Sequence, residues 1–210
     1  MKSTTTILIL LCLCLVVSPA SAGRLLLIPT ADILGFTQIS AQAVIIPNGN
    51  NRAAYWIDAG VFPRTEAELA LFQGAGSGPA PVSAEYQLIP ESTATAAFSL
   101  GVRDITNTTL GSGALYGGNA FYAVASKQIP TGDLLPLGVS DVRAHVGAGT
   151  GSLSGLFAGV EGKIPLGLHL AAEYDTHSVN VGAWFNIFSM VDLGVSSLHS
   201  DLYYSAVVRF

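Results

Sequence analysis

Residues 201–210 have the sequence DLYYSAVVRF. Counting back from Phe210 in steps of two, the residues Val208, Ala206, Tyr204 and Leu202 are all apolar or aromatic, whereas the interleaved residues are mostly polar. Successive side chains of a β-strand point to opposite faces, so this stretch predicts a strand with one apolar and one wetter face. A tilted strand of about 9–11 residues is long enough to cross a bilayer.

The same alternation returns along the rest of the chain, interrupted by turn sequences rich in Gly, Pro and Asn. It predicts about twelve antiparallel strands, an even number, as single-chain bacterial barrels have. Segment 65–73 is also a fair helix former, and the two faces of segment 119–129 are ambiguous. The predicted strands are 35–46, 53–62, 65–73, 82–90, 93–105, 119–129, 139–150, 156–164, 168–176, 179–188, 191–198 and 201–210.

Residues 1–22 have the pattern of a secretory signal peptide. Lys2 gives the positive start, 7–17 is a short apolar run, and 20–22 reads Ala-Ser-Ala, a typical cleavage site. Cys12 and Cys14 both lie in this segment, so a mature chain would contain no cysteine, no disulfide and no thiolate metal site. We divide the chain into a signal peptide (1–22), a lead-in (23–34) and a barrel (35–210).

The composition is unusual for a soluble domain. Charged residues make up only 11% of the chain, against about 25% in ordinary globular domains. Hydrophobic residues make up 50%, yet no later apolar run is long enough for a membrane helix. A secreted chain of this kind suits a closed transmembrane β-barrel, since a sheet spans lipid only without open edges. The alternative is a secreted β-sandwich. The acidic excess argues against nucleic acid as a partner.

Apolar-Pro pairs end alternate predicted strands, and Pro marks strand ends because it cannot donate to the ladder. With the carboxy terminus in the periplasm, these turns all fall on the periplasmic side, and the longer loops 74–81 and 106–118 fall outside. The outward residues Tyr204, Ala206, Val208 and Phe210 resemble the signal that the barrel-assembly machinery recognises. The pairs are Phe62-Pro63, Ile89-Pro90, Ile129-Pro130 and Ile164-Pro165.

Most charges of the predicted strands share one face, and charge on a lipid-facing side is costly. The apolar face is therefore expected to contact outer-membrane lipid, and the charged face to line the lumen. The mixed-sign interior can form internal ion pairs, or it can line a polar pore. The expected lumen residues are Asp58, Glu85, Arg103, Asp141, Arg143, His145, Glu161, Lys163, His169, Glu173, Asp175 and Asp192.

No nucleophile elbow, phosphate loop or zinc-protease motif is present. His177-Ser178 and His199-Ser200 recur at two predicted outer turns, where a nucleophile–base pair of a lipid-modifying enzyme is conceivable. Ordinary turn residues explain them more simply, because catalysis also needs hydrogen-bond geometry and an orienting third group. We expect no enzyme activity, no cofactor and no metal.

The order of short motifs resembles the YjbH-like outer-membrane proteins associated with exopolysaccharide biosynthesis. That resemblance implies a barrel in the bacterial outer membrane with an accessory or conduit role in exopolysaccharide export, and polysaccharide or export proteins as partners. A small-solute porin is the second hypothesis, and a rim-located lipid-modifying enzyme the third. The motifs are Ile28-Pro29-Thr30-Ala31-Asp32, Gly101-Val102-Arg103-Asp104-Ile105, Tyr122-Ala123-Val124-Ala125-Ser126-Lys127, Gly147-Ala148-Gly149-Thr150-Gly151, Phe157-Ala158-Gly159-Val160-Glu161, Ala172-Glu173-Tyr174-Asp175 and Val191-Asp192-Leu193-Gly194.

Overall fold

The computed structural model describes residues 23–46, 52–73, 80–108, 118–130, 138–187 and 190–210. The predicted signal peptide lies outside these residues, as do most of the two predicted outer loops, 74–81 and 106–118.

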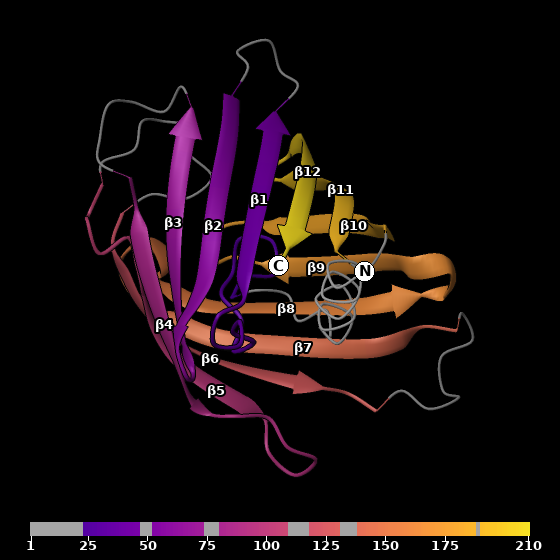
Figure 1. Cartoon of the computed structure of the whole chain (residues 1–210), viewed down its shortest axis with the longest axis horizontal. Helices are drawn as coiled ribbons and strands as arrows, with labels where there is room; N and C mark the ends of the chain where they lie inside the picture. Colours follow the sequence, from indigo (N-terminus) through magenta and orange to yellow (C-terminus); the bar gives the residue numbers. More distant parts are fainter. Residues whose placement is uncertain (1–22, 47–51, 74–79, 109–117, 131–137, 188–189) are drawn as a thin grey trace, which may run out of the picture.

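Twelve antiparallel strands form one closed barrel in which each strand pairs with its neighbours in the sequence (Figure 1). The ring closes where β1 pairs with β12, from Ser40 opposite Arg209 to Ile45 opposite Tyr204. The strands are β1 Ile39–Ile46, β2 Arg52–Phe62, β3 Thr65–Gln73, β4 Val82–Ile89, β5 Ala97–Arg103, β6 Ala120–Gln128, β7 Ser140–Gly149, β8 Gly155–Ile164, β9 Leu168–Tyr174, β10 Val179–Ile187, β11 Val191–Leu198 and β12 Asp201–Arg209.

The predicted barrel, its strand number and its seam are confirmed. Segment 65–73, which could also have formed a helix, is strand β3. The main differences are at strand ends: residues 35–38 form a turn before β1, with Gln38 N–H bonded to Gly35 O at 3.0 Å. Because the strands alternate in direction, the predicted Pro turns lie at the same end of the barrel as Phe210.

Helical structure in the described part of the chain is limited to two short 3₁₀ turns, η2 Gly151–Leu153 and η3 Pro165–Gly167. None of the described helices is long and apolar enough to cross a membrane.

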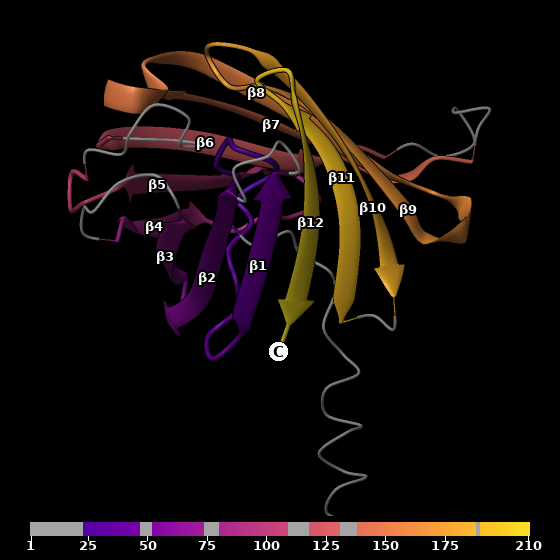
Figure 2. The same ribbon diagram turned by 90° about the horizontal axis from the view of Figure 1, so that it is seen from above.

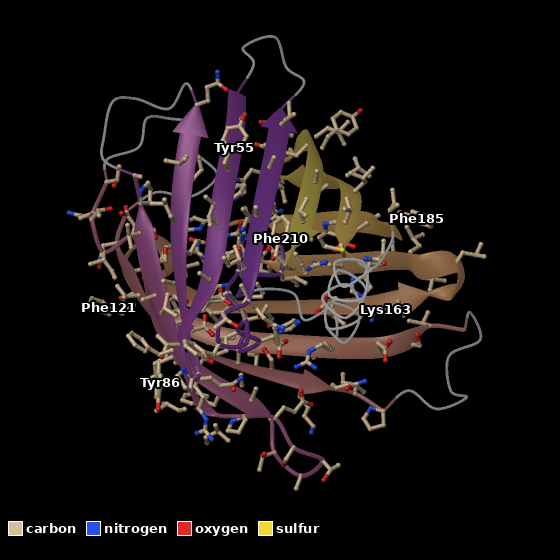
Figure 3. All side chains as sticks on the ribbon, viewed as in Figure 1. Tyr55, Tyr86, Phe121, Lys163, Phe185 and Phe210 are labelled. Atoms are coloured by element: carbon tan, nitrogen blue, oxygen red, sulfur yellow. The ribbon has the colours of Figure 1, made fainter. Side chains whose placement is uncertain are left out.

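The outer face of the barrel is apolar. Large side chains such as Tyr55, Tyr86, Phe121 and Phe185 are between 42% and 63% exposed, and Figure 3 shows Tyr86 and Phe121 projecting beyond the wall. A hollow of about 640 Å³ on the wall of β8–β12 is also lined mainly by aliphatic residues, including Val160, Leu170 and Val181. A protein that kept this surface in water would expose far more apolar area than is usual for a soluble monomer.

The inner face is more mixed than the sequence predicted. On β6, the strand whose faces were ambiguous, Tyr122 and Val124 point inward and are buried, together with Phe157 from β8. A second apolar group surrounds Trp56 on the opposite wall. The expectation of a charged interior therefore holds for part of the lumen, while the rest is packed as a hydrophobic core.

Candidate functional site: a lumen occupied by the lead-in

The lead-in, residues 23–34, lies inside the barrel, and we call it the plug. It folds into a small hairpin in which Gly23 N–H bonds Asp32 O at 2.8 Å and Thr30 N–H bonds Gly23 O at 3.0 Å. Figure 2 shows this indigo segment between β1–β2 on one side and β5–β8 on the other. The sequence left open whether the lead-in is a periplasmic plug or an extra short strand, and the structure places it in the barrel interior.

Apolar plug residues fill the space between the walls. Leu25, Leu27 and Ile28 are buried, with Ile28 fully inaccessible. The wall makes room with glycine: a Cβ on Gly159 would lie 2.5 Å from Leu25 Cδ2 and 2.9 Å from Ile28 Cδ1. A Cβ on Gly182 would lie 2.8 Å from a methyl carbon of Leu26. These two glycines allow a close approach that any larger residue would obstruct.

The plug backbone is held by a wall carboxylate. The N–H groups of Leu26, Leu27 and Ile28 donate to the two oxygens of Glu173 at 3.0, 2.8 and 3.3 Å. Asn180 from β10 donates to the same carboxylate at 3.0 Å. Consecutive backbone N–H groups of this kind form an anion-binding nest, so Glu173 of β9 fixes the turn of the plug.

Four further wall side chains satisfy backbone groups of the plug. Arg103 donates to Leu27 O at 2.6 Å, and Gln87 donates to Ala31 O at 2.7 Å. Ala31 N–H donates to Ser126 Oγ at 2.7 Å, and Leu34 N–H donates to Glu66 at 2.7 Å. Buried backbone groups need such partners because an unsatisfied one is costly. The wall therefore supplies the hydrogen bonds that a sheet partner would otherwise provide.

The wall of β2–β4 carries an acidic patch of Asp58, Glu66, Glu68 and Glu85. Asp58 lies opposite Glu68, and Glu66 lies opposite Glu85. Like charges at directly opposed positions of a sheet destabilise it. The guanidinium of Arg24 is placed against this patch: it pairs with Glu68, donates to Gln42 at 2.7 Å and lies 4.5 Å from the ring centroid of Trp56.

Replacement of Arg24 should therefore weaken the whole barrel. We expect Arg24→Met to lower the free energy of unfolding by about 3–5 kcal/mol, the usual cost of removing one partner of a buried ion pair. Urea unfolding of the detergent-solubilised protein measures this loss. The matched control is Arg64→Met, since Arg64 is exposed in the β2–β3 turn. Equal stabilities of the two variants would contradict the role given to Arg24.

A second ion-pair group ties the plug to the end of the barrel that carries Phe210. Arg143 of β7 donates to Asp32 of the plug and, at 2.7 Å, to Glu91 in the β4–β5 turn. Burial raises the pKa of Glu91, but hydrogen bonds from the Gln128 N–H and from Arg143, together with the nearby charge, outweigh it and hold that pKa below its usual value. The carboxylate is thus held in its charged form at neutral pH.

The other end of the barrel carries the two predicted His-Ser turns. His199 Nε2 lies 2.7 Å from Asp175 Oδ2, and Ser178 Oγ contacts Asp175 and Asn180. Burial raises the pKa of Asp175, but hydrogen bonds from Asn180 and from the backbone of Ser178 and His177 lower it overall. The hydroxyl of Ser178 is therefore committed to a carboxylate and an amide, an arrangement that stabilises a turn and does not activate a nucleophile.

Most of the predicted lumen residues are buried or half-buried. One exception is Asp141, which is exposed at a bulge at the start of β7, where Lys163 lies 3.4 Å away. Asp175 lies in a turn and not within a strand. Arg143, Lys163 and His169 are half-buried. The residues of this set that are buried are Asp58, Glu85, Arg103, His145, Glu161, Glu173, Asp175 and Asp192.

Two small cavities lie between the plug and the wall in the part of the lumen that the structure describes. One lumen cavity, next to Arg24 and His169, has a volume of about 50 Å³, and another, next to Glu66 and Arg103, has about 20 Å³. These volumes suit one or a few water molecules, since a site for one water needs about 10–15 Å³.

Sequence reasoning placed Glu66 and Glu68 on the charged face of their strand but did not select them as site residues, and it missed Arg24 and Asp32. One feature of the sequence could have identified Arg24 and Asp32: the twelve-residue lead-in is mainly apolar and carries only these two charges.

A comparison with models of known families finds no match to this chain, and neither does a comparison with curated protein sequences.

Proposed function

We propose that this protein is an outer-membrane barrel with a closed lumen that serves as an accessory protein in exopolysaccharide export. The observation that carries the proposal is the plug, which is bonded to the wall on several sides; the lumen cavities next to it among the described residues are small. Twelve strands lie between eight-stranded barrels with packed interiors and sixteen-stranded barrels with open channels. The plug gives this barrel a packed interior.

The apolar outer face supports the location in a membrane. The exposed aromatic and aliphatic side chains face outward, and most of the charged strand residues are buried or half-buried. A barrel of this kind satisfies its backbone groups in its own ladder, which is the requirement for a β structure in lipid. The predicted signal peptide would direct the chain to the export pathway.

The link to polysaccharide comes from the resemblance to YjbH-like proteins, and the packed lumen favours the accessory role over the conduit role. A polymer chain is much wider than the cavities between plug and wall. Passage through the barrel would require the plug to leave, with the loss of its contacts to Glu173, Arg103 and Arg143. A role at the membrane surface requires no such rearrangement.

Two measurements test the proposal. Fractionation of cells should recover the protein in the detergent-soluble outer-membrane fraction, and recovery from the periplasm without detergent would refute the membrane location. A deletion strain should lose surface polysaccharide under inducing conditions, and a plasmid copy of the gene should restore it. Normal polysaccharide in the deletion strain would refute the export role and leave the location intact.

A further inference from the structure

Three side chains that could bind a metal ion meet where the plug touches β7 and β8. Asp32 of the plug, His145 of β7 and Glu161 of β8 each offer a ligand atom, and these atoms all lie within 4.8 Å of one another. His145 Nε2 lies 3.5 Å from Glu161 Oε1. Two ligands of a tetrahedral Zn²⁺ with bonds of about 2.0–2.1 Å are separated by roughly 3.3 Å, so this pair already has nearly the right spacing.

Two of the three groups carry buried atoms whose hydrogen bonds are not satisfied. The side chain of His145 is 0% exposed, and its Nε2 makes no contact shorter than the 3.5 Å approach to Glu161 Oε1. Asp32 Oδ2 has no hydrogen-bond partner within the described residues. Buried polar atoms nearly always have a partner, and an exception can indicate a missing ion or water. Here both atoms belong to residues of the cluster, and the imidazole nitrogen faces the Glu161 carboxylate.

Neighbouring residues hold these side chains in place. Ser126 Oγ lies 2.8 Å from His145 Nδ1, and Arg143 donates to the Oδ1 atom of Asp32. A histidine that binds metal through Nε2 carries its proton on Nδ1 and donates it to a neighbouring acceptor, and Ser126 Oγ can accept that proton. The Arg143 contact leaves the other carboxylate oxygen of Asp32, Oδ2, available to the cluster.

The local charges also favour a cation. The carboxylates of Asp32 and Glu91 pair with the guanidinium of Arg143, and Lys127 Nζ lies 3.4 Å from Glu91. Together with Glu161, three carboxylates stand against two fixed positive charges, which leaves one negative charge in excess, the histidines not counted. A buried charge needs compensation, and a bound cation supplies it.

We propose that Asp32, His145 and Glu161 form a binding site for Zn²⁺ or a similar divalent transition metal, which joins the plug to the barrel wall. One imidazole nitrogen and two carboxylate oxygens are common zinc ligands, and three protein ligands leave a position for water. Glu161 also lines the 50 Å³ lumen cavity, which has room for that water. The sequence predicted no metal site because its three ligands are far apart in the chain.

The test uses the full protein purified in detergent and stripped with EDTA. We expect it to bind one equivalent of Zn²⁺, measured by elemental analysis after dialysis, and to bind Zn²⁺ in preference to Mg²⁺ and Ca²⁺. Co²⁺ in place of Zn²⁺ should give the visible absorption bands of a low-symmetry site with a nitrogen ligand. His145→Ala should abolish these bands, and His177→Ala, which changes a histidine at the other end of the barrel, should preserve them.

Asp32→Asn provides a second variant that leaves all barrel strands unchanged. We expect it to weaken Zn²⁺ binding by at least about tenfold, as even loss of a supporting group around a metal does. Gel mobility without boiling shows whether each variant is folded. Failure of the folded wild-type protein to bind Zn²⁺ would overturn the proposal, and so would unchanged binding by Asp32→Asn or by a folded His145→Ala variant.

Discussion

Deletion of residues 24–34 is expected to convert a silent barrel into a conducting one. The plug buries Leu25, Leu27 and Ile28 between the walls, and its removal leaves a lumen lined in part by the acidic patch of β2–β4. Water must enter this space because buried carboxylates without compensation are too costly to remain dry. A continuous, hydrated and negatively charged lumen should pass cations in preference to anions.

Planar bilayer recordings measure this effect. The wild-type protein should give no stepwise currents across the voltage range, and the deletion variant should give frequent ones with cation selectivity. The Arg24→Met variant should give current steps at a frequency between those of the wild type and the deletion variant, because the substitution weakens one anchor of the plug. The Arg64→Met variant should give no current steps, like the wild type. Steady conduction by the wild-type protein, or silence of a correctly folded deletion variant, would show that the plug does not close the lumen.

The wall of the barrel could be predicted from the sequence because side chains along a strand in lipid alternate between apolar and polar with a strict period of two. Residues such as Tyr204 and Ser205 belong to opposite faces whatever the rest of the chain does, and in the structure Tyr204 is exposed and Ser205 is half-buried. The even strand number and the seam follow from counting such segments. The faces of β6 could not be assigned from the sequence, since apolar residues occur on both of them. Its inward side packs against the plug instead of water.

The interior contacts of the plug could not be predicted because they depend on distances across the lumen. Glu173 looked like one charge among many, and nothing local shows that it binds the backbone N–H groups of residues 26–28. The same holds for Asp32, which meets His145 and Glu161 only after the barrel has closed. Contacts of high sequence separation carry no local pattern, whereas the alternation of a strand is local.

Deletion of Phe210 is expected to reduce the amount of assembled barrel severalfold. Its backbone N–H donates to Ile39 O at 2.8 Å, and its carbonyl accepts from Ile39 N–H at 3.1 Å. These two bonds lie at the end of the seam that closes the ring. Without them Ile39 would present open backbone groups at the membrane boundary, and a barrel depends on leaving no open edge. The outward aromatic ring, 67% exposed, would also be lost.

Phe210→Ala separates the two contributions, because it keeps the backbone of residue 210 and removes only the ring. Assembly as poor as in the deletion variant would assign the effect to the aromatic side chain, as recognition by the assembly machinery predicts, and normal assembly would assign it to the seam bonds. The matched control is Ser205→Ala, an inward and half-buried position of the same strand. The measurement is the fraction of protein in urea-washed membranes that migrates as a folded species without boiling. If the deletion of Phe210 and Ser205→Ala assemble equally well, the end of β12 has no special part in closing the barrel.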